Sequence, residues 1–221
     1  MVNVSISMLV IGAFALAVAF IVSRITYKDR FKHNYDIRNH FPYEFNYESN
    51  FKDNLLGNAC FMISAVSLAI FYSTFDMDKN NGLYIAAFIC GVLNTISLIM
   101  MIFLPLKMLK HHLLLVAMAV TFSFLSPFFI ALNGVLSYNA YPDGIKLVPA
   151  IIGVVDCLFI VILFINPRLN KWASLEKKEN EDGSISYVRP KIFVLAFTEW
   201  LLILNNLLIP VVLIISKAII N

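Results

Sequence analysis

Long apolar runs, nearly free of charge, are the feature that most constrains the fold of this chain. A run of about 18 apolar residues or more can cross the hydrocarbon core of a bilayer, about 30 Å thick, as a helix. The sequence therefore predicts an all-α fold, a polytopic membrane protein whose six-helix transmembrane bundle forms a single domain over residues 1–221. The six predicted spans cover residues 4–23, 54–75, 83–104, 113–136, 147–166 and 192–216.

The composition supports a lipid environment. Hydrophobic residues make up 60% of the chain and charged residues only 14%, whereas a soluble domain carries roughly 25% charged residues. A water-soluble core of this size could not bury so much apolar surface, so the lipid bilayer is the first expected partner. No basic face interleaved with aromatic residues favours nucleic-acid binding. No catalytic or cofactor-binding motif is present, and no cofactor is expected.

The positions of the basic residues predict the orientation in the membrane. Three segments, residues 24–53, 105–112 and 167–191, hold fourteen of the seventeen Lys and Arg residues. Cytoplasmic loops are the loops enriched in Lys and Arg. We therefore expect these three segments in the cytosol, both termini outside, and a multi-pass location in the plasma membrane.

Two of the cytoplasmic segments contain local patterns. Tyr43, Tyr47, Phe51 and Leu55 are spaced four residues apart and share one helical face. This spacing predicts either an interfacial helix on the inner leaflet or an ordinary loop packed on the protein. The charged run at residues 176–183 ends in an Asp-Gly turn dipeptide, which could close a small hairpin.

A metal site is the sharper of two interpretations of the cytoplasmic histidines. His33, Asp36, His40 and Glu44 are spaced by three, four and four residues, a spacing that could place metal ligands on one helical face. Pro42 interrupts that face, however, and spacing alone does not show that ligands converge. The alternative is that the histidines of the basic segments face solvent or lipid headgroups.

Two acids lie inside predicted spans. Asp156 lies near the centre of the fifth span and Glu199 lies in the sixth. An aspartate at the centre of a span costs about 2.5 to 3.5 kcal/mol on insertion scales. No Lys or Arg lies inside any predicted span to pair with either acid. Each acid is therefore protonated, bound to a cation, or hydrogen-bonded to neutral groups near water.

Depth counting gathers further polar residues around these acids. At 1.5 Å per helical residue, Asp156 and Asn94 lie about 15 Å from the cytosolic end, Glu199 about 10 Å and Asn206 about 20 Å, and Ser123 is similar to Asn94. These five residues predict a polar layer that binds an ion or substrate near the midplane. For the neutral residues, hydrogen bonding between helices without any function is the alternative.

Three function classes follow from these observations. The first is translocation of a small solute, cation or proton through the bundle, with the intramembrane acids as its site. The second is a non-catalytic membrane partner, a regulatory, binding or immunity subunit or a homo-oligomer, in which the acids pair with a base from another chain. The third is a lipid-modifying membrane enzyme that uses the cytoplasmic histidines and acids. The fold alone selects none of them.

Overall fold

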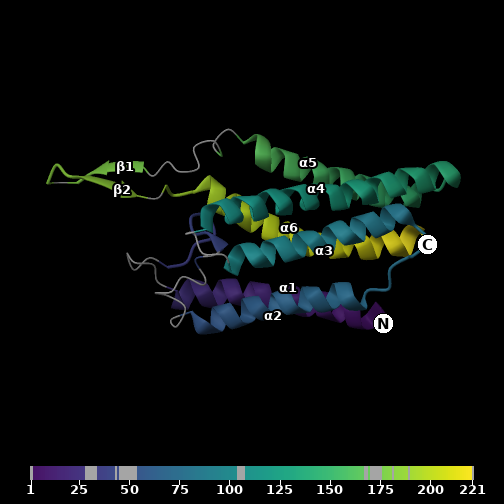
Figure 1. Cartoon of the computed structure of the whole chain (residues 1–221), viewed down its shortest axis with the longest axis horizontal. Helices are drawn as coiled ribbons and strands as arrows, with labels where there is room; N and C mark the ends of the chain where they lie inside the picture. Colours follow the sequence, from purple (N-terminus) through teal and green to yellow (C-terminus); the bar gives the residue numbers. More distant parts are fainter. Residues whose placement is uncertain are drawn as a thin grey trace.

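The computed structural model of the chain is a bundle of six helices with a small β-hairpin at one end (Figure 1). In the part of the chain that the structure describes, six helices are long and apolar enough to cross a membrane, which confirms the predicted all-α bundle. The described residues are 2–27, 34–42, 44, 54–103, 108–166, 169, 176–180, 182–188 and 190–220. The helices are α1 (Val2–Thr26), α2 (Leu55–Thr74), α3 (Gly82–Phe103), α4 (Leu109–Ala140), α5 (Leu147–Ile165) and α6 (Val194–Ile220).

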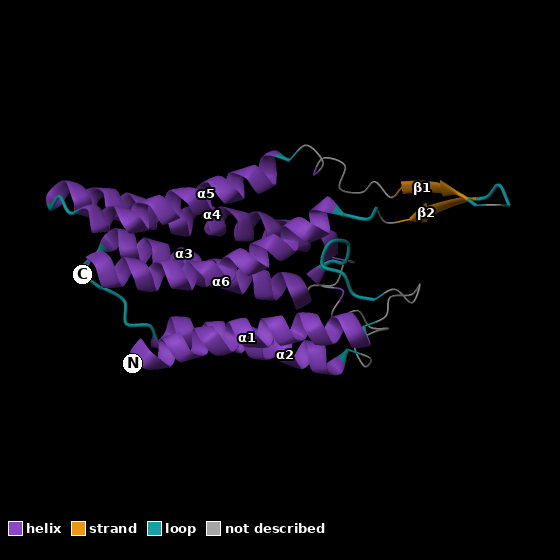
Figure 2. Ribbon diagram, turned by 180° about the vertical axis from the view of Figure 1, so that it is seen from behind, coloured by secondary structure: helices purple, strands orange, loops and turns teal. Residues whose placement is uncertain are grey.

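Both chain ends lie at one end of the bundle, and the hairpin projects from the other (Figures 1 and 2). We call these the terminal end and the hairpin end. The helices lie in three tiers: α1 beside α2, α3 beside α6, and α4 beside α5. The described residues of the three segments predicted to be cytosolic lie at the hairpin end. The sidedness itself, and the kind of membrane, stay predictions.

The hairpin follows the predicted turn. β1 (Glu176–Glu179) pairs antiparallel with β2 (Ile185–Val188). Gly183 in the connecting turn has a φ of 77°, a left-handed conformation that glycine adopts without steric cost. The Asp-Gly dipeptide thus closes a hairpin.

α6 is the central helix of the bundle. It contacts α1, α3, α4 and α5, and its Trp200, Leu202 and Leu213 are completely buried. Large apolar side chains on the outer helices face outward instead, among them Phe14 at 71% exposure and Ile162 at 67%. Lipid tails solvate such side chains, whereas polar groups must be satisfied inside the bundle. Polar residues of α6 therefore lie in the protein interior.

α4 is longer than the apolar run that predicted it. The expected span covers residues 113–136, whereas the helix runs from Leu109 to Ala140. No proline or glycine lies between Leu109 and Leu113 to stop the helix, and a helix can continue beyond the hydrocarbon core. His112, which the sequence places in a linker, consequently lies in the first turn of α4.

The described segment at residues 34–42 folds onto the hairpin end of α6. The Phe193 amide N–H donates to the Arg38 carbonyl oxygen over 2.8 Å, and Trp200 Nε1 donates to the His40 carbonyl oxygen over 2.9 Å. His40 is only 2% exposed and His112 only 4%. The expectation that the cytoplasmic histidines face solvent or headgroups is therefore wrong for these two, because this segment and the helix ends cover them.

The predicted interfacial helix is only partly described. The backbone N–H of Phe41 donates to Glu44 Oε2 over 2.8 Å, and the Glu44 N–H donates to the Phe41 carbonyl oxygen. This reciprocal arrangement resembles a helix N-terminal cap, with Pro42 in the first helical position. The aromatic residues expected on its apolar face, 43, 47 and 51, lie outside the described residues.

Candidate functional site

The three neutral residues predicted for the polar layer form one hydrogen-bonded network. Ser123 Oγ of α4 donates to Asn94 Oδ1 of α3 over 3.1 Å. Asn94 Nδ2 donates to Asn206 Oδ1 of α6 over 3.0 Å. The Thr95 hydroxyl also lies 3.0 Å from Asn206 Oδ1 and shares its proton with the Gly91 carbonyl oxygen. The network ties α3, α4 and α6 together, and its members satisfy one another.

Asp156 lies apart from this network. Its side chain is 8% exposed, and neither carboxylate oxygen accepts a hydrogen bond from a described residue. Asn205 of α6 is 1% exposed and lies beside the carboxyl. The geometry completes no hydrogen bond between the two side chains, and both polar atoms of the Asn205 amide are unpaired among the described residues. The two side chains form an open polar pair between α5 and α6.

Close packing of α5 on α4 sets the position of Asp156. Gly153, one turn earlier, lies so near α4 that a Cβ atom there would come within 2.5 Å of the Pro127 carbonyl oxygen and 2.9 Å of the Ala131 backbone nitrogen. Asp156 shares the Gly153 face and therefore points into the bundle. The opposite face of α5, with Val155 at 60% exposure, is apolar and points outward.

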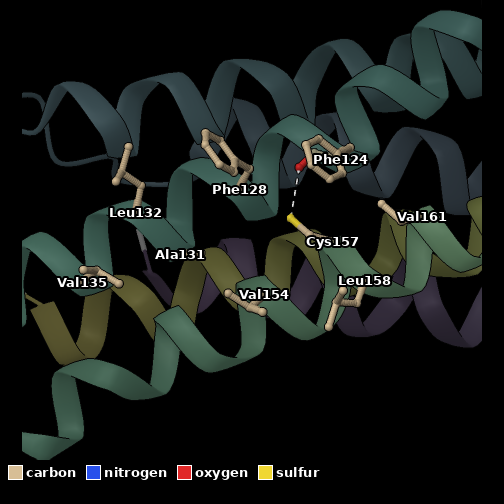
Figure 3. A pocket seen from close by; sticks show the side chains of 9 residues that line it. All are labelled: Phe124, Phe128, Ala131, Leu132, Val135, Val154, Cys157, Leu158 and Val161. Atoms are coloured by element: carbon tan, nitrogen blue, oxygen red, sulfur yellow. Dashed lines mark hydrogen bonds between the residues drawn. The ribbon is translucent and has the colours of Figure 1, made fainter.

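An apolar groove of about 400 Å³ lies between α4 and α5 (Figure 3). The Cys157 thiol at its wall donates to the Phe124 carbonyl oxygen over 3.5 Å. The residues that line the groove include neither Asp156 nor another ionisable carboxyl. They are Phe124, Phe128, Ala131, Leu132, Val135, Val154, Cys157, Leu158 and Val161. The groove suits apolar chains and leaves the buried acid inside the bundle.

Glu199 has a partner that the sequence did not suggest. His112 Nε2 lies 3.5 Å from Glu199 Oε1, and the two side chains are only 6% and 3% exposed. Glu199 Oε2 has no hydrogen-bond partner among the described residues. Glu199 precedes Asn205 by six residues, or about 9 Å along α6. The two acids therefore belong to two separate sites.

The described residues do not support the predicted metal site. His33 lies outside them, and no group of three His, Cys, Asp or Glu side chains among them converges as metal ligands would. Asp36 instead forms an ion pair with Arg38 at 2.7 Å, a hydrogen bond that lowers the Asp36 pKa. The His40 ring stacks on Tyr35, with ring centroids 5.1 Å apart.

Comparison with family models, with curated proteins and with solved structures finds no match to this chain. A functional interpretation therefore depends on the chemistry of the polar sites themselves. Of the five predicted site residues, three are joined in the α3–α4–α6 network, and each acid stands in a site of its own. The roles assigned to these residues stay predictions.

Two residues of these sites escaped the sequence-based prediction. His112 was missed because the apolar run starts after it, although a helix extended by one turn would have placed it on the inward face of α4. Asn205 was missed because depth counting gives adjacent residues nearly the same height and does not tell which of them faces Asp156. No signal in the sequence placed residues 34–42 over Glu199.

Proposed function

We propose that this multi-pass membrane protein binds a proton or a small monovalent cation at Asp156 and carries it through the helix bundle. The observation that carries the proposal is the burial of Asp156 between α5 and α6, where neither carboxylate oxygen accepts a hydrogen bond from a described residue. An ionised carboxylate without a partner is costly in a low-dielectric interior, so the group takes up a proton or a cation instead.

The neighbourhood of Asp156 supports a small charged ligand. The unpaired Asn205 amide offers an oxygen that could bind a cation and an N–H that could donate to the carboxyl. The neighbouring Asn94–Ser123–Asn206 network is already satisfied by its own hydrogen bonds. The network therefore supports the site structurally, and its residues are not expected to bind the ligand.

Flux measurements in proteoliposomes test this function. Purified protein is reconstituted with an internal dye sensitive to protons, Na⁺ or K⁺, and a gradient of the ion that the dye reports is imposed in a separate experiment for each. We expect a flux driven by one of these gradients that Asp156→Asn abolishes. Glu179→Gln is the matched control, because it removes the same charge from an exposed position on β1, and it should leave the flux unchanged.

The substitution at Asp156 should not impair folding. Its carboxylate accepts no hydrogen bond from the described residues, so an amide of the same shape breaks no hydrogen bond to them. Helix content and elution volume in detergent check this point. If the wild-type protein supports no flux, the proposal is wrong. Co-purification of a second membrane chain that is lost in Asp156→Asn would then favour the partner role.

A further inference from the structure

A buried acid–base pair lies at the hairpin end, outside the site proposed for transport. His112 stands in the first turn of α4 and Glu199 in the second turn of α6, with Nε2 and Oε1 3.5 Å apart. Both side chains are more than nine-tenths buried, and Glu199 Oε2 has no hydrogen-bond partner in the part of the chain that is described. The pair thus has an oxygen free to receive a further proton.

Residues 34–42 and 44, called the cover below, lie over this pair. Trp200, the residue after Glu199, donates its indole N–H to the His40 carbonyl oxygen. The Trp200 ring contacts Tyr35 edge to face, with centroids 6.0 Å apart. The Tyr35 hydroxyl in turn donates to the Phe41 carbonyl oxygen over 2.9 Å, which closes the segment on itself. The cover is therefore attached to α6 directly beside the acid.

Other titratable groups lie close to the pair. Glu44, which belongs to the cover, is a second buried carboxyl near Glu199. Tyr35 lies near the Glu44 and Glu199 carboxyls. The rings of His40 and Tyr27 pack against it. Without a proton the pair carries one negative charge in a buried place beside another acid. With one proton, its net charge is zero.

We propose that His112 and Glu199 form a second proton-binding site, which exchanges one proton with water at the hairpin end when the cover formed by residues 34–42 and 44 opens. The proton comes from water or hydronium and is held between the imidazole Nε2 and the carboxylate, and it returns to water on release. No other bond is made or broken. The site does not depend on transport through Asp156, because it is complete within α4, α6 and the covering segment.

The protonation of the pair can be measured directly. The full-length protein, labelled with ¹⁵N-histidine and ¹³C-glutamate, is incorporated in nanodiscs and titrated by NMR between about pH 5 and 8, where histidine normally changes charge. Loss of a signal in His112→Gln and in Glu199→Gln assigns the two resonances. We expect His112 or Glu199 to change protonation state within this pH range in the wild type. If His112 instead stays protonated over the whole range, it should change protonation state within the range in Glu199→Gln.

Glu199→Gln should weaken proton binding by His112 at least tenfold, a shift of its midpoint by about one pH unit to lower pH, because the negative partner is gone. His111, which is exposed in the same turn, is the internal control, and its midpoint should not move. Asp156→Asn should leave the His112 titration intact even where it abolishes flux, so the two proposals fail separately. A His112 midpoint that is equal in the wild type and Glu199→Gln would overturn the second site.

The role of the cover is tested by the rate at which the His112 ring proton exchanges with water. Trp200→Phe keeps an aromatic ring but removes the indole N–H that holds the His40 carbonyl oxygen. We expect faster exchange of the His112 ring proton with water at an unchanged midpoint. An unchanged exchange rate would contradict the assignment of residues 34–42 and 44 as the cover.

Discussion

Adjacent asparagines on α6 offer a sharp test of the polar architecture. Asn206 Oδ1 accepts from Asn94 Nδ2 and lies within hydrogen-bond distance of the Thr95 hydroxyl, at 3.0 Å in each case. The Asn205 amide makes no hydrogen bond to a described residue. Both side chains are nearly fully buried, at 4% and 1% exposure. Replacement by the similarly shaped leucine should therefore have opposite consequences at the two positions.

The magnitudes follow from the number of hydrogen bonds lost. A hydrogen bond between membrane helices contributes about 0.6 kcal/mol on average and at most about 1.7 kcal/mol, so the loss of two at Asn206 should cost about 1.2 kcal/mol and no more than about 3.4 kcal/mol. At Asn205 no bond is lost. The leucine removes an unpaired buried amide, whose burial costs about 1 to 3 kcal/mol. Asn205→Leu should leave the free energy of unfolding unchanged or raise it.

Reversible unfolding in mixed micelles with increasing SDS, followed by helix content and by Trp fluorescence, gives the two free energies. We expect Asn206→Leu to be less stable than Asn205→Leu by at least about 1 kcal/mol. The flux assay tests the function of Asn205 separately. Asn205→Leu should reduce Asp156-dependent flux although it does not destabilise the protein. Equal destabilisation by both substitutions would refute the division into a satisfied network and an open pair.

Gly153→Val with its control Gly82→Val, and separately Tyr35→Phe, test the contacts that position the sites. Gly153→Val should destabilise the protein by about 1 to 3 kcal/mol in the same assay, because its side chain would meet backbone atoms of α4, whereas Gly82→Val, with no atom near its Cβ position, should have little effect. Tyr35→Phe removes the hydrogen bond to the Phe41 carbonyl oxygen, at a cost of about 0.5 to 1.5 kcal/mol at neutral pH. Burial raises the Tyr35 pKa well above its usual range, so the neutral phenol stabilises the fold fully below about pH 10 and loses this contribution as pH rises further. Unfolding scans at alkaline pH should show that loss in the wild type and a smaller one in Tyr35→Phe.

The sequence predicted the helices well because the physical signal is strong. A bilayer requires long apolar helices, and the charged residues between them mark where each helix leaves the hydrocarbon. The ends were less certain, since a helix such as α4 (Leu109–Ala140) continues beyond its apolar run until turn residues stop it. That one extra turn decides whether His112 belongs to a loop or meets Glu199.

The polar layer was predicted only by depth. Counting residues gives the height of a side chain along the helix axis, but the partner depends on how each helix is rotated and on which helices are neighbours. Asn94, Ser123 and Asn206 met because all three face the junction of α3, α4 and α6. Asp156, at a similar predicted height, faces Asn205 instead.

The distribution of hydrogen bonds bears on how a buried ligand could be exchanged. α3, α4 and α6 are joined by a satisfied network, and the Tyr84 hydroxyl of α3 donates to the Leu213 carbonyl oxygen of α6 over 2.7 Å. Between the described residues of α5 and α6, the polar contact is the open pair of Asp156 and Asn205. Displacement of α5 from α6 would therefore break no side-chain hydrogen bond there, while it would expose the carboxyl. A disulfide introduced between α5 and α6 should abolish Asp156-dependent flux until it is reduced, whereas one between α3 and α6 should leave the flux intact; the reverse result would place the moving element elsewhere.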